Sequence, residues 1–217
     1  MTGTAYRCAG VAEVTSTREF TRVLPDLPFN DQADPVAGAR EPARSTWSGL
    51  LLDRVSDVRF FYDTEFIDNG RTIELISIGV VAEDGREYYA VSTEFPAEQA
   101  GRWVKTHVLP KLPPPSSQLW RSRRRIREDL EEFFGIDGDE PIELWAWVAA
   151  YDHVALCQLW GPMTSLPPQI PRFTRELRQF WEDRGCPRMP PRPKDTHDAL
   201  VDAQHNLRRY RIMTGSA

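Results

Sequence analysis

The pattern of apolar and polar positions changes at residue 58. From there, three segments rich in β-branched and aromatic residues follow one another at 58–64, 73–81 and 86–92. Short polar turns at 68–70 (DNG) and 83–85 (EDG) separate them. The middle segment is apolar almost throughout, which is typical of a central strand. The pattern predicts an antiparallel meander of three strands.

Helical periodicity dominates the rest of the chain. Helices are predicted at 97–109, 117–134, 152–160, near 173–184 and near 197–213, with one further strand at 143–148. Ser117 is the expected N-cap of the second helix, and Gly135 is its expected stop. A meander followed by alternating helices and strands predicts one mixed α/β domain over residues 58–214.

Residues 1–57 have a different texture. Thr, Ala, Pro, Asp and Arg alternate there with short apolar fragments, and no stretch keeps a period of 2 or 3.6. We expect a disordered N-terminal extension of low order. An alternative is a mistaken upstream start, with a GTG codon at Val58 as the true one. The mass of the native protein would separate the two, since the full chain weighs 24.9 kDa.

Composition excludes some classes of protein. The 217 residues carry a net charge of −5, and no apolar run approaches the roughly 18 residues that cross a bilayer. The N-terminus lacks the basic-then-apolar layout of a signal peptide, so a cytoplasmic protein without a membrane partner is expected. An acidic chain that binds nucleic acid needs local basic patches to do so.

Two carboxylates, Asp63 and Glu65, lie at the end of the first predicted strand. The period of a strand places both side chains on one face, with Cα atoms roughly 6.6 Å apart. Like charges at this distance are costly to bury unless a cation neutralises them, so the pair suits a divalent metal ion. A D-x-E pair also occurs at solvated strand ends, and this interpretation stays open.

Asp152, His197 and Asp202 are the other candidates for chemistry. Asp152 lies where a very apolar strand gives way to a helix, a place where aspartate also serves as an N-cap. His197 and Asp202 are five positions apart at the start of the last predicted helix, so both can line one cleft. Taken singly, an exposed histidine and a solvated aspartate are the simpler interpretation of that pair.

Taken in order, these residues resemble a known set. The D-x-E pair lies in FFYDTEFIDNGRTIELISIGVV, an apolar strand leads to Tyr151-Asp152, and H-x-x-x-x-D begins the last helix in HDALVDAQHN. The order is similar to the DEDDh branch of the DEDD 3′-to-5′ exonuclease superfamily, the RNase T and oligoribonuclease type. The greatest similarity is to the mycobacterial polyadenylate-specific 3′-exoribonuclease family, RNase AS, over residues 58–214. One departure is that Ala149 and Ala150 precede Tyr151-Asp152, where an Asn is common a few residues before the pair.

The resemblance implies an RNase H-like α/β fold, a mixed five-stranded sheet flanked by helices. It also implies a metal-dependent 3′-to-5′ exoribonuclease that acts on RNA 3′ ends, adenylate-rich or single-stranded, and releases nucleoside 5′-monophosphates. On this basis Asp63, Glu65, Asp152 and Asp202 hold two Mg²⁺ ions, for which Mn²⁺ substitutes, and His197 is the general base. A two-metal site stabilises both the attacking and the leaving oxygen of the phosphodiester. Relatives imply a homodimer.

Substrate contacts are expected on both sides of these groups. Phe66 and Ile67 follow the D-x-E pair, where related enzymes place residues against the 3′-terminal base, although Phe66 fits a core position equally well. Arg192 and Lys194 belong to a basic cluster before His197 that is expected to hold the phosphate backbone. A second basic cluster, at 121–127, is followed by acidic residues that can pair with it on a solvated face.

Two other functions stay open on the residues alone. The same active-site set serves proofreading DNA exonucleases, and a non-catalytic RNA-binding module could keep the fold. All five catalytic positions are filled, which argues against the module. Of the other histidines, His153 and His205 are expected on a surface or a helix face, with a contact behind the site as the alternative. His107 is expected to be structural.

Overall fold

The computed structural model describes residues 58–194 and 196–216 of the 217-residue chain. The predicted N-terminal extension and the alternative start lie outside the described residues, except that Val58 itself begins the first strand. No helix in the described part is long and apolar enough to cross a lipid bilayer.

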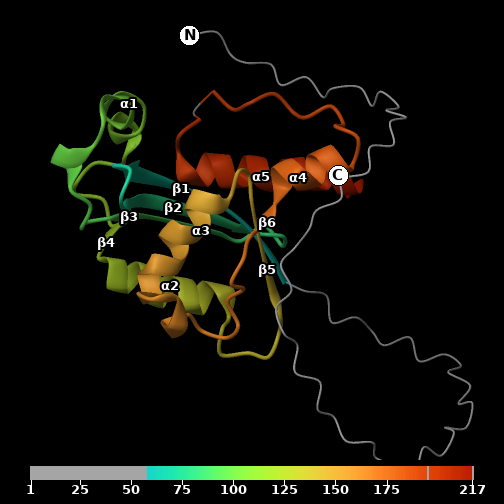
Figure 1. The fold of residues 1–217 in the computed structure, drawn as a ribbon, viewed down its shortest axis with the longest axis horizontal. Coiled ribbons are helices and arrows are strands. Elements are labelled where there is room, and N and C mark those ends of the chain that lie inside the picture. The colour runs from blue at the N-terminus through green and yellow to red at the C-terminus, as the bar shows by residue number, and fades with distance from the viewer. Residues whose placement is uncertain (1–57, 195, 217) are drawn as a thin grey trace, which may run out of the picture. The chain divides into compact units, whose positions relative to one another are not determined.

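A single mixed sheet organises the fold (Figure 1). Its strands are β1 (Val58–Asp68), β2 (Ile73–Ala82), β3 (Glu87–Ser92), β4 (Trp120–Arg121), β5 (Ile142–Ala146) and β6 (Arg175–Glu176). They lie in the order β4-β3-β2-β1-β5-β6. The predicted meander is confirmed, since β1 pairs with β2 and β2 with β3, both antiparallel. The other pairs, β1 with β5, β3 with β4 and β5 with β6, are parallel.

The sheet has six strands where five were expected. The two outermost strands, β4 and β6, are each two residues long. Such a short pair leaves no alternating pattern in the sequence, because the period of 2 needs about four residues to be visible. These two edge strands therefore form through their pairing with β3 and β5 and not through a local sequence pattern.

Five α-helices accompany the sheet. They are α1 (Arg102–His107), α2 (Arg123–Phe134), α3 (Ala150–Cys157), α4 (Leu177–Asp183) and α5 (Ala199–Thr214). Short 3₁₀ turns are η1 (Ala97–Gln99), η2 (Leu109–Lys111), η3 (Gln158–Trp160) and η4 (Met163–Ser165). The single helix expected over 97–109 is wrong: the segment divides into η1, α1 and the start of η2. Gly101 lies in extended conformation between the first two, and Pro110 occupies the second position of η2.

The start of α2 also differs from the prediction. Ser122 caps this helix, accepting a hydrogen bond from the backbone N–H of Arg125 at 3.2 Å, and Ser117 does not. The residues between them include β4, which pairs with β3 and so cannot be helical. The predicted stop is confirmed, because Gly135 ends α2 in the left-handed region at φ 69°.

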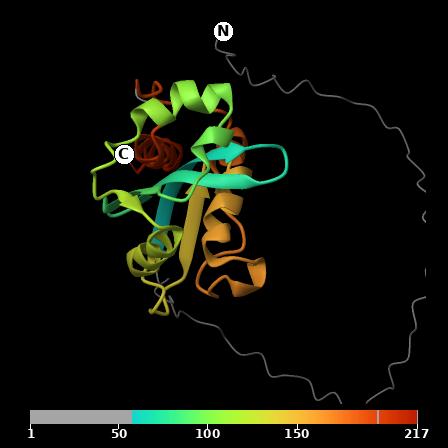
Figure 2. The ribbon, with the colours of Figure 1, turned by 90° about the vertical axis from the view of Figure 1, so that its left-hand side faces the viewer.

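Helices cover both faces of the sheet (Figure 1). Successive side chains of β1 alternate between the faces, so Phe60 and Tyr62 pack in the core that includes residues of α2 and α3. Phe61 packs on the opposite face, against residues of α4 and α5. Figure 2 shows α5 nearly end-on, with the green segment that contains α1 beside it. The same alternation sends Asp63 and Glu65 to the α5 side.

The first turn of α5 lies directly on β2. Gly79 of β2 is the register partner of Asp63 in β1. A Cβ atom added at Gly79 would lie 2.4 Å from backbone atoms of Ala199 and Leu200. Real Cβ atoms do not approach backbone atoms this closely, so only glycine lets the helix lie so near the strand. The close approach places Asp202, in the first turn of α5, beside the end of β1.

Candidate active site

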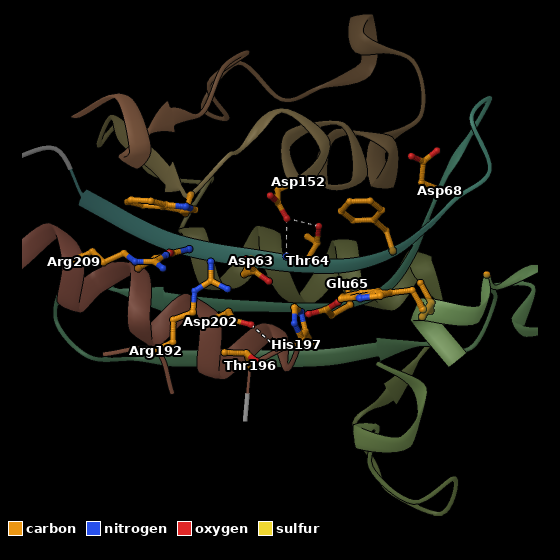
Figure 3. Close-up of a pocket in the computed structure, with 16 residues that line it drawn as sticks. Asp63, Thr64, Glu65, Asp68, Asp152, Arg192, Thr196, His197, Asp202 and Arg209 are labelled. Carbon is orange, nitrogen blue, oxygen red and sulfur yellow. Dashed lines mark hydrogen bonds between the residues drawn. The ribbon is translucent and has the colours of Figure 1, made fainter. Parts of the chain in front are cut away.

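A cleft of about 490 Å³ opens where the end of β1 meets the first turns of α3 and α5. Asp63 and Glu65 of β1, Asp152 of α3 and Asp202 of α5 all line it. Figure 3 shows these four carboxylates converging from their three elements. The structure therefore brings together all four of the predicted acids, from positions as far apart in sequence as Asp63 and Asp202.

Asp152 is held by the residue between the other two acids of β1. The side chain of Thr64 faces away from Asp63 and Glu65, and its Oγ1 donates to Asp152 Oδ1 at 2.6 Å. The backbone N–H of Thr64 donates to the same oxygen at 2.8 Å (Figure 3). Asp152 is 6% exposed, so these bonds are shielded from water. They occupy Oδ1, and no side chain of the described residues hydrogen-bonds to Oδ2.

We expect Thr64→Val to weaken the site without removing any acid. Valine keeps the shape of threonine but cannot donate to Asp152, which loosens that carboxylate. Loss of an outer partner of a metal ligand typically costs 10–100-fold in metal affinity or activity. The divalent-cation concentration for half-maximal activity should rise about tenfold, measured by titration. Thr64→Ser restores the hydroxyl and should restore the wild-type value; an unchanged titration for Thr64→Val would show that the bond is dispensable.

The loop that leads into α3 is held by a carboxylate from β6. Glu176 Oε1 accepts from Val148 N and Oε2 from Ala149 N, both at 2.8 Å. Val148 has φ 59°, a left-handed conformation that is costly for a β-branched residue. The two bonds hold this backbone in place. Glu176 therefore fixes the backbone just before Tyr151-Asp152.

The carboxylates repel one another. No cation lies within 4 Å of Asp63, Glu65, Asp152 or Asp202 among the ion pairs of the described residues. Burial, followed by the nearby Asp202 and Asp152, raises the pKa of Glu65 to about 8. Burial raises the pKa of Asp152 to about 6 against the opposing bonds from Thr64. The pKa of Asp63 is also well above its ordinary value, through burial and then the charge of Asp152.

His197 lies against Asp202 at the mouth of the cleft. Its backbone N–H donates to Asp202 Oδ2 at 2.7 Å, and its own φ is 70°. The ring of Trp103 meets the imidazole edge-on, with centroids 4.7 Å apart. Burial lowers the pKa of His197, and the cations Lys111 and Arg192 add to this against Asp202. The imidazole is therefore neutral at neutral pH and can accept a proton.

The remaining histidines lie outside the cleft. His153 is half-buried, and its Nδ1 is 3.0 Å from Thr174 Oγ1. His205 lies on α5 but is buried at 2% exposure, so of the two expected positions it takes the helix face and not the surface; its Nδ1 has no hydrogen-bond partner among the described residues. His107 is exposed and stacks on Trp103, with centroids 5.0 Å apart. Trp103 therefore contacts both His107 and His197.

The predicted substrate residues separate in the structure. Phe66 and Arg192 line the cleft. Phe66 is stacked on Tyr151, with ring centroids 5.7 Å apart and 9° between the planes. Ile67 does not line the cleft: it is 2% exposed and packs in the core with Ile76, beyond the register shift between Glu65 and Phe66. Lys194 is exposed and lies outside the cleft lining.

The basic cluster at 121–127 is paired with acids, as the solvated-face interpretation expected. Arg125 Nε lies 2.8 Å from Asp129 Oδ1, one turn further along α2. Arg124 and Arg127 make i,i+4 pairs of the same kind at 3.6 and 3.7 Å. These charges are neutralised along the helix.

Several residues of the cleft were not singled out from the sequence. Trp103, Trp147, Asn206 and Arg209 line it alongside the acids. For two of them a signal exists, because Asn206 and Arg209 follow Asp202 by four and seven positions, which places all three on one face of a helix. Trp103 and Trp147 come from loops and short elements whose position depends on tertiary packing, so no local pattern identifies them.

Comparisons with known proteins identify the family of the chain. A family described as the 3′-5′ exoribonuclease Rv2179c-like domain matches residues 58–214. Two proteins of Mycobacterium tuberculosis are each 79% identical over 159 residues, covering 73% of this chain and 95% of the relative. They are the 3′-5′ exoribonuclease Rv2179c of strain H37Rv and the 3′-5′ exoribonuclease MT2234.1 of strain CDC 1551.

Among solved structures, the chain is similar to cell-death related nuclease 4 (CRN-4). The identity is 12% and the TM-score 0.45, over 74% of this chain and 64% of that one. The family match and the two relatives carry the assignment. The matched segment, residues 58–214, forms the sheet, its helices and the acidic cleft. Because the family model covers this whole segment and the relatives are 79% identical, the chain belongs to the Rv2179c-like 3′-5′ exoribonuclease domain family.

Proposed function

We propose that this chain is a metal-dependent exoribonuclease that removes nucleotides one at a time from the 3′ end of RNA. The observation that carries the proposal is the convergence of four carboxylates and His197 in one cleft. The assignment to RNA rests on the 3′-5′ exoribonuclease activity for which the family and the relatives are named. The released product in this proposal is a nucleoside 5′-monophosphate.

The donor set fits hard divalent cations. Glu65, His197 and Asp202 offer ligand atoms that all lie within 4.8 Å of one another, which is close enough to hold a metal ion. Burial raises the pKa of both Glu65 and Asp152, and a bound cation would oppose that shift by favouring the charged carboxylates. Carboxylate oxygens are the ligands that Mg²⁺ and Mn²⁺ prefer. We therefore infer that Asp63, Glu65, Asp152 and Asp202 hold two Mg²⁺ ions, with Mn²⁺ able to substitute.

Two such ions stabilise the charge that develops on the attacking and leaving oxygens of a phosphodiester. The residues themselves have separate tasks. His197 accepts a proton from the water that attacks phosphorus, since a nitrogen of its ring lies within 4.8 Å of carboxylate oxygens of Glu65 and Asp202. The bond that breaks joins the scissile phosphorus to the 3′ oxygen of the preceding nucleotide, and that oxygen leaves with a proton. Phe66 and Trp103 offer ring faces at the mouth of the cleft for the terminal base.

His197→Ala should slow turnover without preventing metal binding. General-base catalysis contributes typically 10²–10⁴-fold, so kcat should fall by about 10²-fold or more. Because the pKa of His197 is lowered, the wild-type rate should rise with pH below about 6.5 and level off above it. The measurement is a pH–rate profile of both proteins. A variant whose profile keeps the wild-type shape would remove His197 from this role.

The decisive test of the proposal uses RNA labelled at its 5′ end, with a single-stranded 3′ end. The purified protein is incubated with it in Mg²⁺, in Mn²⁺ and in EDTA, beside DNA of the same sequence. We expect a ladder that shortens from the 3′ end of RNA and is absent in EDTA. Shortening of DNA in preference to RNA would favour a proofreading-type exonuclease instead. Binding of RNA with no cleavage in either metal would favour a non-catalytic module.

Three further features belong to the same proposal. We propose a cytoplasmic location, which fractionation of the native cells tests. We also propose a homodimer, for which the resemblance to the family is the support, and light scattering of the purified protein tests it. A preference for adenylate-rich 3′ ends is tested by comparing homopolymer tails in the ladder assay.

A further inference from the structure

Two arginines occupy one end of the cleft. Arg192, from the segment before α5, and Arg209, from the third turn of α5, are the Lys or Arg residues among its described lining. Figure 3 shows both on the same side of the carboxylates, with Asp68 at the opposite end. No ion pair within 4 Å involves either of them in the described residues. The cleft therefore has basic side chains at one end and acidic side chains along the rest of its length.

Arg209 is held in place by two neutral contacts. Its Nη1 donates to Asn206 Oδ1 at 2.9 Å, and Asn206, which is 1% exposed, in turn donates to the backbone oxygen of Tyr62 at 3.0 Å. Its guanidinium also lies over the ring of Trp147, 4.1 Å from the centroid. Trp147 in turn packs against Trp181, with ring centroids 6.1 Å apart. These contacts orient the guanidinium without placing it in an ion pair within 4 Å of a described carboxylate.

The two arginines also disfavour each other. Burial lowers the pKa of Arg209 to about 10, and the positive charge of Arg192 contributes in the same direction, against the opposing charges of Asp202 and Asp63. An unpaired, partly buried cation beside a second cation is costly unless an anion binds between them. Arginine presents a planar fork of donors that matches phosphate oxygens, and stacking on an aromatic ring leaves that fork free. The chemistry of this end of the cleft therefore suits a phosphate group.

The position of the arginines selects which phosphate. An RNA 3′-terminal nucleotide carries the scissile phosphate and ends in uncharged hydroxyls, whereas the chain on its 5′ side carries one phosphate per nucleotide. The Asp68 end, with Phe66 and Trp103 nearby, suits the uncharged terminal nucleoside. We propose that Arg209, together with Arg192, binds the phosphate that precedes the scissile one on the 5′ side. The inference rests on the proposed function, and it fixes the direction in which RNA lies in the cleft.

Dinucleotides test this subsite directly. ApA contains only the scissile phosphate, and pApA adds a 5′ phosphate at the preceding position. For the wild type we expect kcat/KM to be about tenfold or more higher on pApA, the size of a charge-assisted hydrogen bond. Arg209→Met should reduce the pApA-to-ApA ratio to near 1, and Arg209→Lys should leave an intermediate ratio, because lysine keeps the charge and loses the fork.

Arg208→Met is the matched control, since it removes the same charge from the neighbouring, exposed position of α5. It should keep the wild-type ratio. A wild type that does not distinguish the two dinucleotides, an Arg209→Met variant with the wild-type ratio, or an equal loss in Arg208→Met would each overturn the subsite. Thermal melting of each variant verifies that the fold is intact.

A binding measurement separates failure of the subsite from failure of the proposed activity. Each variant is combined with Asp152→Asn, and its affinity for a labelled single-stranded RNA is measured against salt by fluorescence anisotropy. Each lost phosphate contact reduces the slope of log K against log salt by about 0.7 for a single strand. Arg209→Met should lose about 0.7, and Arg208→Met should lose none. An unchanged slope in Arg209→Met overturns the subsite whether or not the protein cleaves RNA.

Discussion

Asp63→Asn should reduce turnover of RNA by about 10³-fold while the protein folds normally. Asparagine keeps the size of aspartate and removes the charge at the centre of the acidic cluster. A divalent ion contributes several kcal/mol of transition-state stabilisation, and each 1.36 kcal/mol is a factor of ten in rate. The ladder assay on wild type and variant measures the loss. Asp84→Asn, in the exposed turn between β2 and β3, is the matched control and should be fully active.

The same substitution should stabilise the protein when metal is absent. The folded-state pKa of Glu65 is about 8 and that of Asp152 about 6, both above the ordinary values of 4.5 and 3.8. The folded protein therefore binds more protons than the unfolded chain between about pH 4 and 8, and its stability falls as pH rises through this window. Removing one charge with Asp63→Asn weakens the repulsion that the other acids experience.

The measurement is a melting curve in EDTA at pH 5 and at pH 8. The wild-type Tm should fall between these values, and Asp63→Asn should melt higher than wild type at pH 8 by at least about 2 °C, the shift that 1 kcal/mol makes in a domain of this size. Adding Mg²⁺ at pH 8 should raise the wild-type Tm more than that of the variant. A variant that melts below wild type in EDTA would contradict the repulsion.

Gly79→Ala should destabilise the domain by about 3 kcal/mol, at the upper end of what overpacking costs. The added Cβ would lie 2.4 Å from the backbone of Ala199 and Leu200, and backbone atoms cannot rotate away as a side chain can. Either the first turn of α5 moves off the sheet or the domain melts earlier. A shift of α5 also displaces Asp202 from Asp63, so activity should fall together with Tm.

Gly138→Ala is the control for this substitution. The nearest atom to its added Cβ is the carbonyl oxygen of Gly135 at 3.4 Å, an ordinary contact, and it lies far from the cleft in the turn after α2. It should change both Tm and activity little. Chemical denaturation of the three proteins gives the free energies of unfolding. Equal stability of Gly79→Ala and Gly138→Ala would show that the sheet and α5 can separate without cost.

The strong local signals in the sequence predicted the meander and the site acids. Turns at 68–70 and 83–85 and apolar alternation defined β1 to β3, since register and face follow from the period of 2. The D-x-E pair shares a face of β1 for the same reason. The order of the acids along the chain, compared with a known family, then placed Asp152 and Asp202 in the cleft. The acids were thus predictable because their positions follow either from the local geometry of a strand or from an order along the chain that a known family shares.

What could not be predicted depends on contacts between distant segments. β4 and β6 exist only because β3 and β5 offer edges. Ile67 was expected at the substrate, but it packs in the core with Ile76, and the register shift between Glu65 and Phe66 interrupts the simple alternation of β1 just before it. Glu176 accepts a hydrogen bond from the backbone N–H of Val148, although the two residues are 28 positions apart in the chain. No local pattern reports such a pairing.

The left-handed backbone at Val148 has a consequence for protein engineering. The side chain of Val148 is 58% exposed, so little packing is lost when it is replaced, whereas its φ of 59° costs roughly 1–2 kcal/mol for a residue with a branched Cβ. Asparagine adopts this conformation readily. Val148→Asn should therefore raise Tm by about 2–4 °C, measured by calorimetry. The variant would be a more stable starting protein for further substitutions that are themselves destabilising.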